Sequence, residues 1–182
     1  MSKNQRDPSL WLDQINKNKQ EPDYDRKKAI ICDLDGTLAF PTDRSFYEEE
    51  KCITDLPNLP VVKAITLFAN AGYQILFTSG RQEKSRDATY NWLLKYVVCD
   101  FKDFYKNKDP NDRLNLIRNI QLFMRRDGDM RPDTVVKKEI YDNEIKDFNY
   151  VEAVFDDRPS VCRTWWELGL FVFKCHQSDK EF

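Results

Sequence analysis

Two aspartates, Asp33 and Asp35, lie two positions apart in the sequence, directly after a short apolar run and just before Gly36. This spacing lets one carboxylate act as a nucleophile while the other reaches the departing oxygen from the same side. An Asp-x-Asp pair is weak on its own, because it also occurs by chance and in sugar-transferring enzymes that use it to hold a metal. The apolar run before it and the glycine-permitted turn after it make the pattern much more specific. We therefore predict that this pair of carboxylates belongs to a catalytic site.

A second polar segment, Thr78-Ser79-Gly80-Arg81, follows another apolar run. Its hydroxyl groups can donate to a phosphoryl oxygen, and Gly80 allows the backbone to approach a ligand closely. The guanidinium of Arg81 offers a planar set of donors that suits phosphate. A tight turn with a solvated arginine would have the same sequence, so the segment is informative mainly through its position. On that basis we predict that it binds phosphate.

Two further segments contribute charges of both signs. Asp133 and Lys137 open a predicted helix, in which Asp133 is expected to be the N-cap and Lys137 lies one turn inside. Asp156 and Asp157 end an apolar run, where two adjacent carboxylates would repel each other without a cation. Together with Asp33 they offer the hard oxygen ligands that Mg²⁺ prefers. We predict a magnesium site, because such an acidic pocket would otherwise repel a phosphate dianion.

The elements that must position these residues alternate between two periods along the chain. Short apolar runs typical of buried strands are followed by runs with apolar residues at helical spacing. Strands are expected at residues 29–32, 75–77, 120–124, 151–155 and 170–173, and helices at 61–71, 88–96, 136–140 and 159–168. This order predicts an α/β fold with a doubly wound parallel sheet. Ligands bind beyond the carboxyl ends of the strands in such sheets, so the polar segments are expected to form one site.

The motif at residues 33–38 resembles the signature of haloacid dehalogenase-type phosphatases, which implies a Rossmann-like core with a small cap insert. A narrower resemblance rests on Arg44, the Ser-Gly-Arg segment, GDxRxDxVVKxEI at 128–140 and DDRxSVCxxW at 156–165. With these residues, the chain from about residue 29 to 175 is similar to the 3′-phosphatase domain of bacteriophage-type polynucleotide kinase/phosphatases. The resemblance implies Mg²⁺-dependent removal of a 3′-phosphate from polynucleotide ends through an aspartyl-phosphate intermediate, as a step of nucleic-acid end repair.

The resemblance also implies a role for each site residue. Asp33 would be the nucleophile and Asp35 the acid and base. Lys137, in preference to its neighbour Lys138, would balance the charge on the nucleophile and the phosphoryl oxygens. The remaining implied residues are Ser79 for catalysis, Arg44, Thr78, Gly80, Arg81 and Asp133 for substrate binding, and Asp33, Asp35, Asp156 and Asp157 for Mg²⁺. Arg44 by itself would be taken for a surface-loop residue.

The predicted domain organisation has two parts. Residues 1–27 are expected to form an N-terminal arm, and residues 28–182 one haloacid dehalogenase-like domain with a cap segment at about 39–60 and an insert at about 95–118. The insert combines aromatic residues with Lys102, Lys106 and Lys108, which could stack bases and hold a backbone. Its aspartates fit an ordinary solvated helix equally well, in which case Arg44, Arg125 and Arg126 are the next candidates to hold a strand end. No GxxxxGK[ST] motif is present, so no kinase half is expected.

Composition argues against several classes of protein. The 29 Lys and Arg residues face 31 Asp and Glu residues, a net charge of -2 that does not suit a protein coating nucleic acid by electrostatics. The single histidine, His176, argues against a histidine-based triad or zinc site. Five cysteines without a CxxC pair predict reduced thiols, and no segment resembles a signal peptide or a membrane helix. A cytoplasmic protein without a membrane partner is expected.

Two substrate classes fit the predicted chemistry. A cap of about twenty residues leaves the site open, which favours bulky substrates such as 3′-phosphorylated DNA or RNA ends. The alternative is a phosphatase of free nucleotides or other small phosphomonoesters. A third possibility is a module that binds phosphorylated ends without chemistry, and the presence of both Asp33 and Asp35 counts against it.

Overall fold

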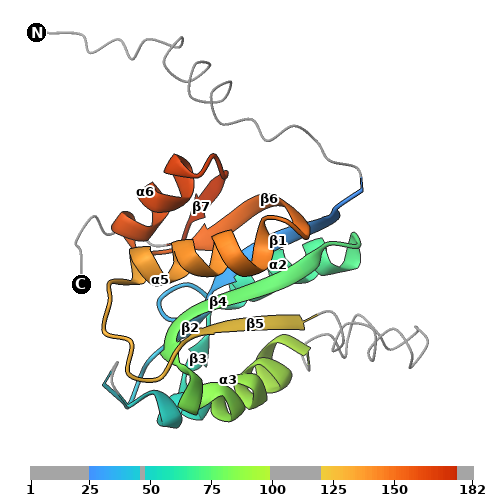
Figure 1. Cartoon of the computed structure of the whole chain (residues 1–182). Coiled ribbons are helices and arrows are strands. Elements are labelled where there is room, and N and C mark those ends of the chain that lie inside the picture. Colours follow the sequence, from blue (N-terminus) through green and yellow to red (C-terminus); the bar gives the residue numbers. More distant parts are fainter. Residues whose placement is uncertain (1–24, 46–47, 99–119, 176–182) are drawn as a thin grey trace, which may run out of the picture.

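The computed structural model describes residues 25–45, 48–98 and 120–175, which contain a five-stranded parallel sheet (Figure 1). The strands lie in the order β5-β4-β1-β6-β7, and all neighbours run parallel. Their bounds are Lys27–Asp33 for β1, Gln74–Gln82 for β4, Ile120–Arg125 for β5, Asn149–Asp156 for β6 and Val172–Lys174 for β7. The predicted α/β fold with a parallel sheet is confirmed.

The helices begin and end near the residues that the sequence indicates. Their bounds are Leu59–Asn70 for α2, Arg86–Leu93 for α3, Asp133–Ile140 for α5 and Pro159–Glu167 for α6. Pro159 is at the first turn of α6, where its missing N–H removes no helical hydrogen bond. The positive φ angles of Gly72 and Gly169 end α2 and α6, as predicted. Short π-helical turns, Leu94–Val98 and Tyr141–Ile145, prolong α3 and α5.

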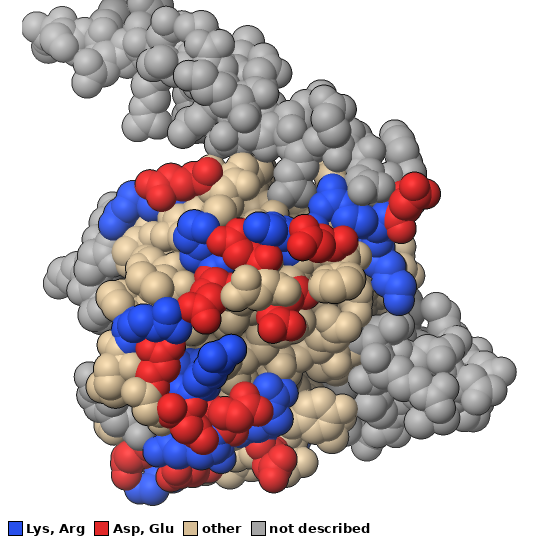
Figure 2. All heavy atoms as spheres, viewed as in Figure 1, with Lys and Arg blue, Asp and Glu red and all other residues tan. Residues whose placement is uncertain are grey.

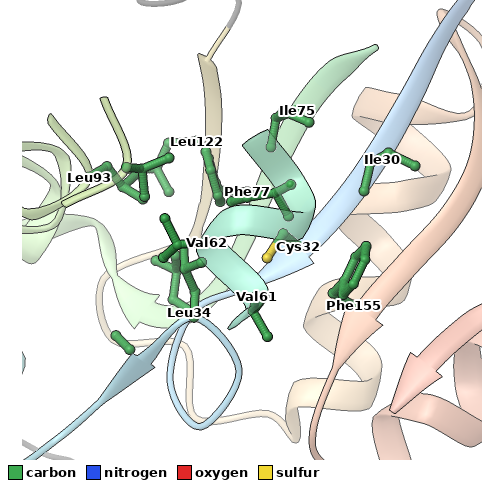
Figure 3. Packing of buried hydrophobic residues seen from close by; sticks show 14 of the residues in the cluster. Ile30, Cys32, Leu34, Val61, Val62, Ile75, Phe77, Leu93, Leu122 and Phe155 are labelled. Carbon is green, nitrogen blue, oxygen red and sulfur yellow. The ribbon is translucent and has the colours of Figure 1, made fainter. Parts of the chain in front are cut away.

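The hydrophobic core lies on both faces of the sheet, because successive strand residues point to opposite sides. Ile30 and Cys32 of β1 belong to one cluster, which α2 and α3 cover and which Figure 3 shows from close by. Ala29 and Ile31 belong to a second cluster on the other face, which is covered by α6 and by the π-helical turn after α5. Helices on both faces of a parallel sheet are the doubly wound arrangement that the sequence predicts.

A small second sheet lies near the carboxyl ends of the strands (Figure 1). It consists of β2 (Ala39–Phe40) paired antiparallel with β3 (Leu56–Pro57), and the 3₁₀ helix η1 (Glu49–Thr54) precedes β3. These elements fall in the predicted cap segment at 39–60. The cap is therefore a hairpin and one short helix in the described part of this segment.

Two details of the strands differ from expectation. β4 continues through the segment 78–81 to Gln82, so the predicted phosphate-binding residues end the strand instead of following it. β7 begins at Val172, two residues later than predicted. Most of the N-terminal arm and of the 95–118 insert lies outside the described residues. Among the residues that are described, no helix is long and apolar enough to cross a membrane.

Candidate active site

The loop with the predicted nucleophile begins at Asp33, the last residue of β1, and the chain turns sharply after it. The backbone N–H groups of Leu38 and Ala39 both donate to the carbonyl oxygen of Leu34, each at 2.8 Å. Gly36 has a φ of +88°, and a Cβ atom there would lie 2.3 Å from Oδ2 of Asp157. Only glycine meets both conditions without strain, so it brings this loop against the carboxyl end of β6.

Lys137 of α5 reaches Asp33 from one side of the sheet. Its Nζ donates to Oδ1 of Asp33 at 2.6 Å and to Oδ2 of Asp156 at 2.9 Å, and the side chain is only 3% exposed. Burial alone would lower the pKa of Lys137, but the charges of Asp156 and Asp33 outweigh it and hold this pKa far above its usual range. Lys138 instead points to Asp142 and is half exposed. The structure thus brings Lys137, and not Lys138, to Asp33.

Asp33, Asp156 and Asp157 form an acidic group whose ligand atoms, one from each carboxylate, all lie within 4.8 Å of one another. Burial raises the pKa of Asp33 well above its usual range, and the charge of Lys137 only partly opposes this effect. Burial and the neighbouring Asp156 also raise the pKa of Asp157. Three clustered carboxylates, of which burial disfavours Asp33 and Asp157 as anions, form a donor set that fits a hard divalent cation.

Hydrogen bonds from neighbouring elements orient this acidic group. Thr37 Oγ1 donates to Oδ1 of Asp157 at 3.1 Å. Trp165 Nε1 donates to Oδ2 of Asp156 at 3.1 Å, although the Trp165 ring is otherwise part of the core under α6. Donors that orient metal-ligating side chains are a common feature of metal sites, so both contacts suit the role predicted for the acidic group.

The carboxylate of Asp35 lies outside the acidic group, although the resemblance implies it as a fourth Mg²⁺ ligand. Arg81 donates to both of its oxygens, Nε to Oδ2 and Nη2 to Oδ1, each at 2.7 Å. Arg44 Nη2 donates to Oδ1, also at 2.7 Å. Burial alone would raise the pKa of Asp35, but the hydrogen bonds and charges of Arg81 and Arg44 lower it. The side chain of Asp35 is therefore bound by arginines in this structure.

Asp55 is absent from the predicted site residues, yet it completes this arrangement. It is fully buried directly after η1. Its Oδ1 accepts from Nε of Arg44 at 2.8 Å, and its Oδ2 accepts from Nη2 of Arg44 at 2.6 Å and from Nη2 of Arg81 at 3.0 Å. We call these four residues, Asp35, Arg44, Asp55 and Arg81, the arginine cluster. An aspartate that follows a short polar helix is ordinarily a solvated turn residue. The local sequence therefore gives no reason to assign Asp55 to the site.

The two arginines of this cluster are less accessible than the predicted role suggests. The side chains of Arg44 and Arg81 are 0% and 1% exposed. Nη1 of Arg81 also donates to Oγ1 of Thr89 at 3.2 Å. In the structure both guanidinium groups bind carboxylates of the protein, and direct phosphate binding by either one stays a prediction.

Asp133 is the first residue of α5, and its predicted role as N-cap is wrong. Pro132 holds the N-cap position, and no side chain caps the helix. The carboxylate of Asp133 instead accepts from Nη1 of Arg158 at 2.6 Å and from Nη2 of Arg125. A Cβ atom at Gly80 would lie 2.7 Å from Oδ1 of Asp133. The close approach that Gly80 allows is therefore made by Asp133, a protein carboxylate.

Arg125 is bound within the protein in the same way. It is buried, its Nε donates to the carbonyl oxygen of Gly80 at 2.8 Å, and its Nη1 donates to the carbonyl oxygens of Asp129 and Arg131 at 3.0 and 2.6 Å. These contacts hold the loop between β5 and α5. Arg125 is thus not exposed to hold a strand end, whereas Arg126 is.

The two hydroxyl residues near the end of β4 are both buried. Thr78 lies beside Asp33 in the strand register, and its Oγ1 has no hydrogen-bond partner among the described residues. Oγ of Ser79 accepts from the backbone N–H of Arg81 at 3.2 Å, which leaves its proton free to donate. Both hydroxyls therefore lie at the same edge of the sheet as Asp33, and their contact with substrate stays a prediction.

A protein-family model described as "Polynucleotide kinase PNKP phosphatase domain" matches residues 27–180, which is most of the chain. The chain belongs to this family. Its parallel sheet, small antiparallel hairpin and clustered carboxylates are thus those of a haloacid dehalogenase-type phosphatase domain of the PNKP family. The resemblance seen in the sequence is confirmed at the level of the family.

Two kinds of relative accompany this match to the PNKP phosphatase family. A protein of Autographa californica nuclear polyhedrosis virus, named "Putative bifunctional polynucleotide kinase/RNA ligase", is 36% identical over 145 residues, which is 79% of this chain and 18% of the viral protein. Chains in two solved structures, of the "Pnkp1/Rnl/Hen1 complex" and of the "Pnkp1/Rnl/Hen1 RNA repair complex", are each 31% identical with a TM-score of 0.71. They match 88% of this chain, and this chain covers 50% and 46% of them. The chain therefore spans half or less of each relative's length.

Proposed function

We propose that this chain is a Mg²⁺-dependent phosphomonoesterase that removes the 3′-phosphate from DNA or RNA ends. The observation that carries the proposal is the contact of Lys137 with both Asp33 and Asp156, within an acidic group at the carboxyl edge of the sheet. Membership of the PNKP phosphatase family supports the polynucleotide substrate.

In the proposed reaction a carboxylate oxygen of Asp33 attacks phosphorus, and the bond from phosphorus to the 3′ oxygen breaks. Asp35 gives its proton to the departing oxygen, and afterwards takes a proton from the water that hydrolyses the aspartyl phosphate. The lowered pKa of Asp35 suits the second step, because that step needs the ionised carboxylate. The first step requires that Asp35 has taken up a proton from solvent before the 3′ oxygen departs, against the effect of Arg81 and Arg44. Arg44 and Arg81 hold this carboxylate in place for both steps.

The charges around Asp33 serve the same reaction. Lys137 balances the charge that develops on the nucleophile and the phosphoryl oxygens. A Mg²⁺ ion held by Asp33, Asp156 and Asp157 would neutralise the phosphoryl oxygens. Ser79 and Thr78, which lie at the same edge of the sheet as Asp33, would donate hydrogen bonds to these oxygens.

The small size of the cap is an argument for a bulky substrate. Its described part is a two-stranded hairpin and the six residues of η1, which is too little to enclose a small molecule. The names of the relatives refer to polynucleotide kinase, RNA ligase and RNA repair, which supports a role in preparing ends for joining. We infer that ligation or 5′-phosphorylation is carried out by another domain or protein.

The test is phosphate release from 3′-phosphorylated RNA and DNA oligonucleotides, compared with free 3′- and 5′-nucleotides, in the presence of Mg²⁺. The proposal predicts a higher kcat/KM for an oligonucleotide than for any free nucleotide. Equal or better hydrolysis of a free nucleotide would favour the alternative, a phosphatase of small phosphomonoesters. No hydrolysis of any of them by the folded protein would favour a binding module.

A further inference from the structure

The hairpin of the cap presents an exposed apolar pair. Phe40 of β2 and Leu56 of β3 are cross-strand partners, and they are 40% and 56% exposed. Directly paired residues on one face of a two-stranded sheet lie side by side, so the two side chains form one surface. We call this pair the hairpin platform. Nothing in the proposed chemistry accounts for an aromatic residue held open to solvent here.

The platform points away from the α2–α3 side of the molecule. Ala39, which precedes Phe40, is fully buried in the cluster that α2 and α3 cover. Asp55, which precedes Leu56, is fully buried in the arginine cluster. Because side chains alternate along a strand, Phe40 and Leu56 face the opposite direction. In β1, Asp33 lies two residues after Ile31, so both side chains point to the face of the sheet away from α2 and α3. The contact of Lys137 from α5 with Asp33 is on this same face.

Hydrogen bonds tie the hairpin to the nucleophile loop. The backbone N–H of Gly36 donates to the carbonyl oxygen of Ala39 at 2.9 Å, and Asp35 forms a β-bridge with Ala39. Nδ2 of Asn58 donates to the carbonyl oxygen of Thr37 at 2.8 Å. Phe40 is therefore one residue away from the contact that closes the loop, and its position relative to Asp33 and Asp35 is set by the backbone.

We propose that the hairpin platform binds, by stacking, a nucleobase next to the 3′-phosphate of a polynucleotide. This inference rests on the proposed function and adds a binding site to it. An aromatic ring is the side chain that stacks on bases of any sequence. The surface that these two side chains offer suits the area of one base. It is far smaller than the area buried in a stable protein interface, which is about 1,600 Å². On the face that Figure 2 shows, basic and acidic side chains are intermingled. Attraction between this face and the phosphates of a polynucleotide is therefore weak, and base stacking would add to the affinity.

The test is a cycle in which Phe40→Ala is combined with removal of a base from the substrate. Parent and variant are compared on a 3′-phosphorylated oligonucleotide and on two copies of it, with an abasic site at the last or at the next-to-last nucleotide. Phe40→Ala should lower kcat/KM on the complete oligonucleotide by about tenfold, since a stacked base contributes about 1–3 kcal/mol. The same variant should lose almost nothing on one of the two abasic substrates, and Phe40→Trp should keep the parent value.

Phe148→Ala is the matched control, because Phe148 is 68% exposed just before β6, at the amino end of the sheet. It should change no substrate preference. An unchanged preference in Phe40→Ala would overturn the platform while leaving the proposed function intact. The platform proposal would also be overturned if Phe40→Ala changed the oligomeric state and its effect on kcat/KM were the same with and without each base. That result would favour a contact between protein chains. Failure of the parent to prefer oligonucleotides at all would overturn both proposals.

Discussion

Asp55 offers a direct test of the arginine cluster, and the variant of choice is Asp55→Asn. Asparagine keeps the size of the side chain but removes its negative charge. In the parent, two buried guanidinium groups face two carboxylates, Asp35 and Asp55, and Asp55 alone accepts three of the hydrogen bonds. In the variant, Arg44 and Arg81 share the single charge of Asp35, and the amide NH₂ group of the introduced side chain faces a guanidinium donor.

The expected loss of stability is large. Removing one partner of a buried ion pair costs about 3–5 kcal/mol, because the remaining charge is left uncompensated. A domain of this size is usually stable by about 5–15 kcal/mol, so the loss is a substantial part of the total. Urea unfolding should show a lower midpoint for Asp55→Asn. Asp43→Asn is the control, since Asp43 is exposed in the same cap segment, and its free energy of unfolding should change by less than about 0.5 kcal/mol.

The arginine cluster also predicts for which substrates Asp55→Asn reduces turnover most. Arg44 and Arg81 hold Asp35, whose proton is needed when a sugar hydroxyl departs but not when an activated aryl group departs. Asp55→Asn should therefore reduce turnover of a 3′-phosphorylated oligonucleotide more than turnover of an activated aryl phosphate. Equal losses on both substrates would show that Asp55 supports only the fold. An unfolding free energy equal to that of Asp43→Asn would refute the physical argument itself.

Three other predictions concern the catalytic groups. Asp33→Asn should lower turnover at least about 1,000-fold, on the order of 4 kcal/mol, and near-parent phosphate release would exclude the covalent mechanism. Lys137→Met should lower turnover by about 100-fold or more, because Asp33 and Asp156 lose their buried cation, whereas Lys138→Met should resemble the parent in the same assay. EDTA should abolish activity, which Mg²⁺ should restore and Ca²⁺ should restore poorly because of its larger and looser coordination shell; full activity in chelator would argue against a metal at Asp156 and Asp157.

Much of the architecture follows from the sequence alone. The apolar runs predict the place of each strand of the parallel sheet, because burial on both faces requires near-continuous apolar sequence, although β4 continues to Gln82 past its predicted end at residue 77. Asp33, Asp156 and Asp157 follow or end two of these runs. Since parallel strands end at one edge of the sheet, the sequence predicts a common edge for these residues, and the pairing of β1 with β6 then brings them together. Gly36 is also predictable, as the turn after Asp35 needs a residue without a Cβ atom.

Only the tertiary structure decides which charges pair. Lys137 lies 104 residues from Asp33, and its choice over Lys138 depends on which side of α5 faces the sheet. Asp133 looks like a helix cap in sequence, yet Arg125 and Arg158 bind its carboxylate. Asp55 looks like a turn residue, yet it is the buried partner of two arginines. Local sequence reports periodicity and turn chemistry, whereas the partner of a buried charge depends on packing between elements distant in the chain.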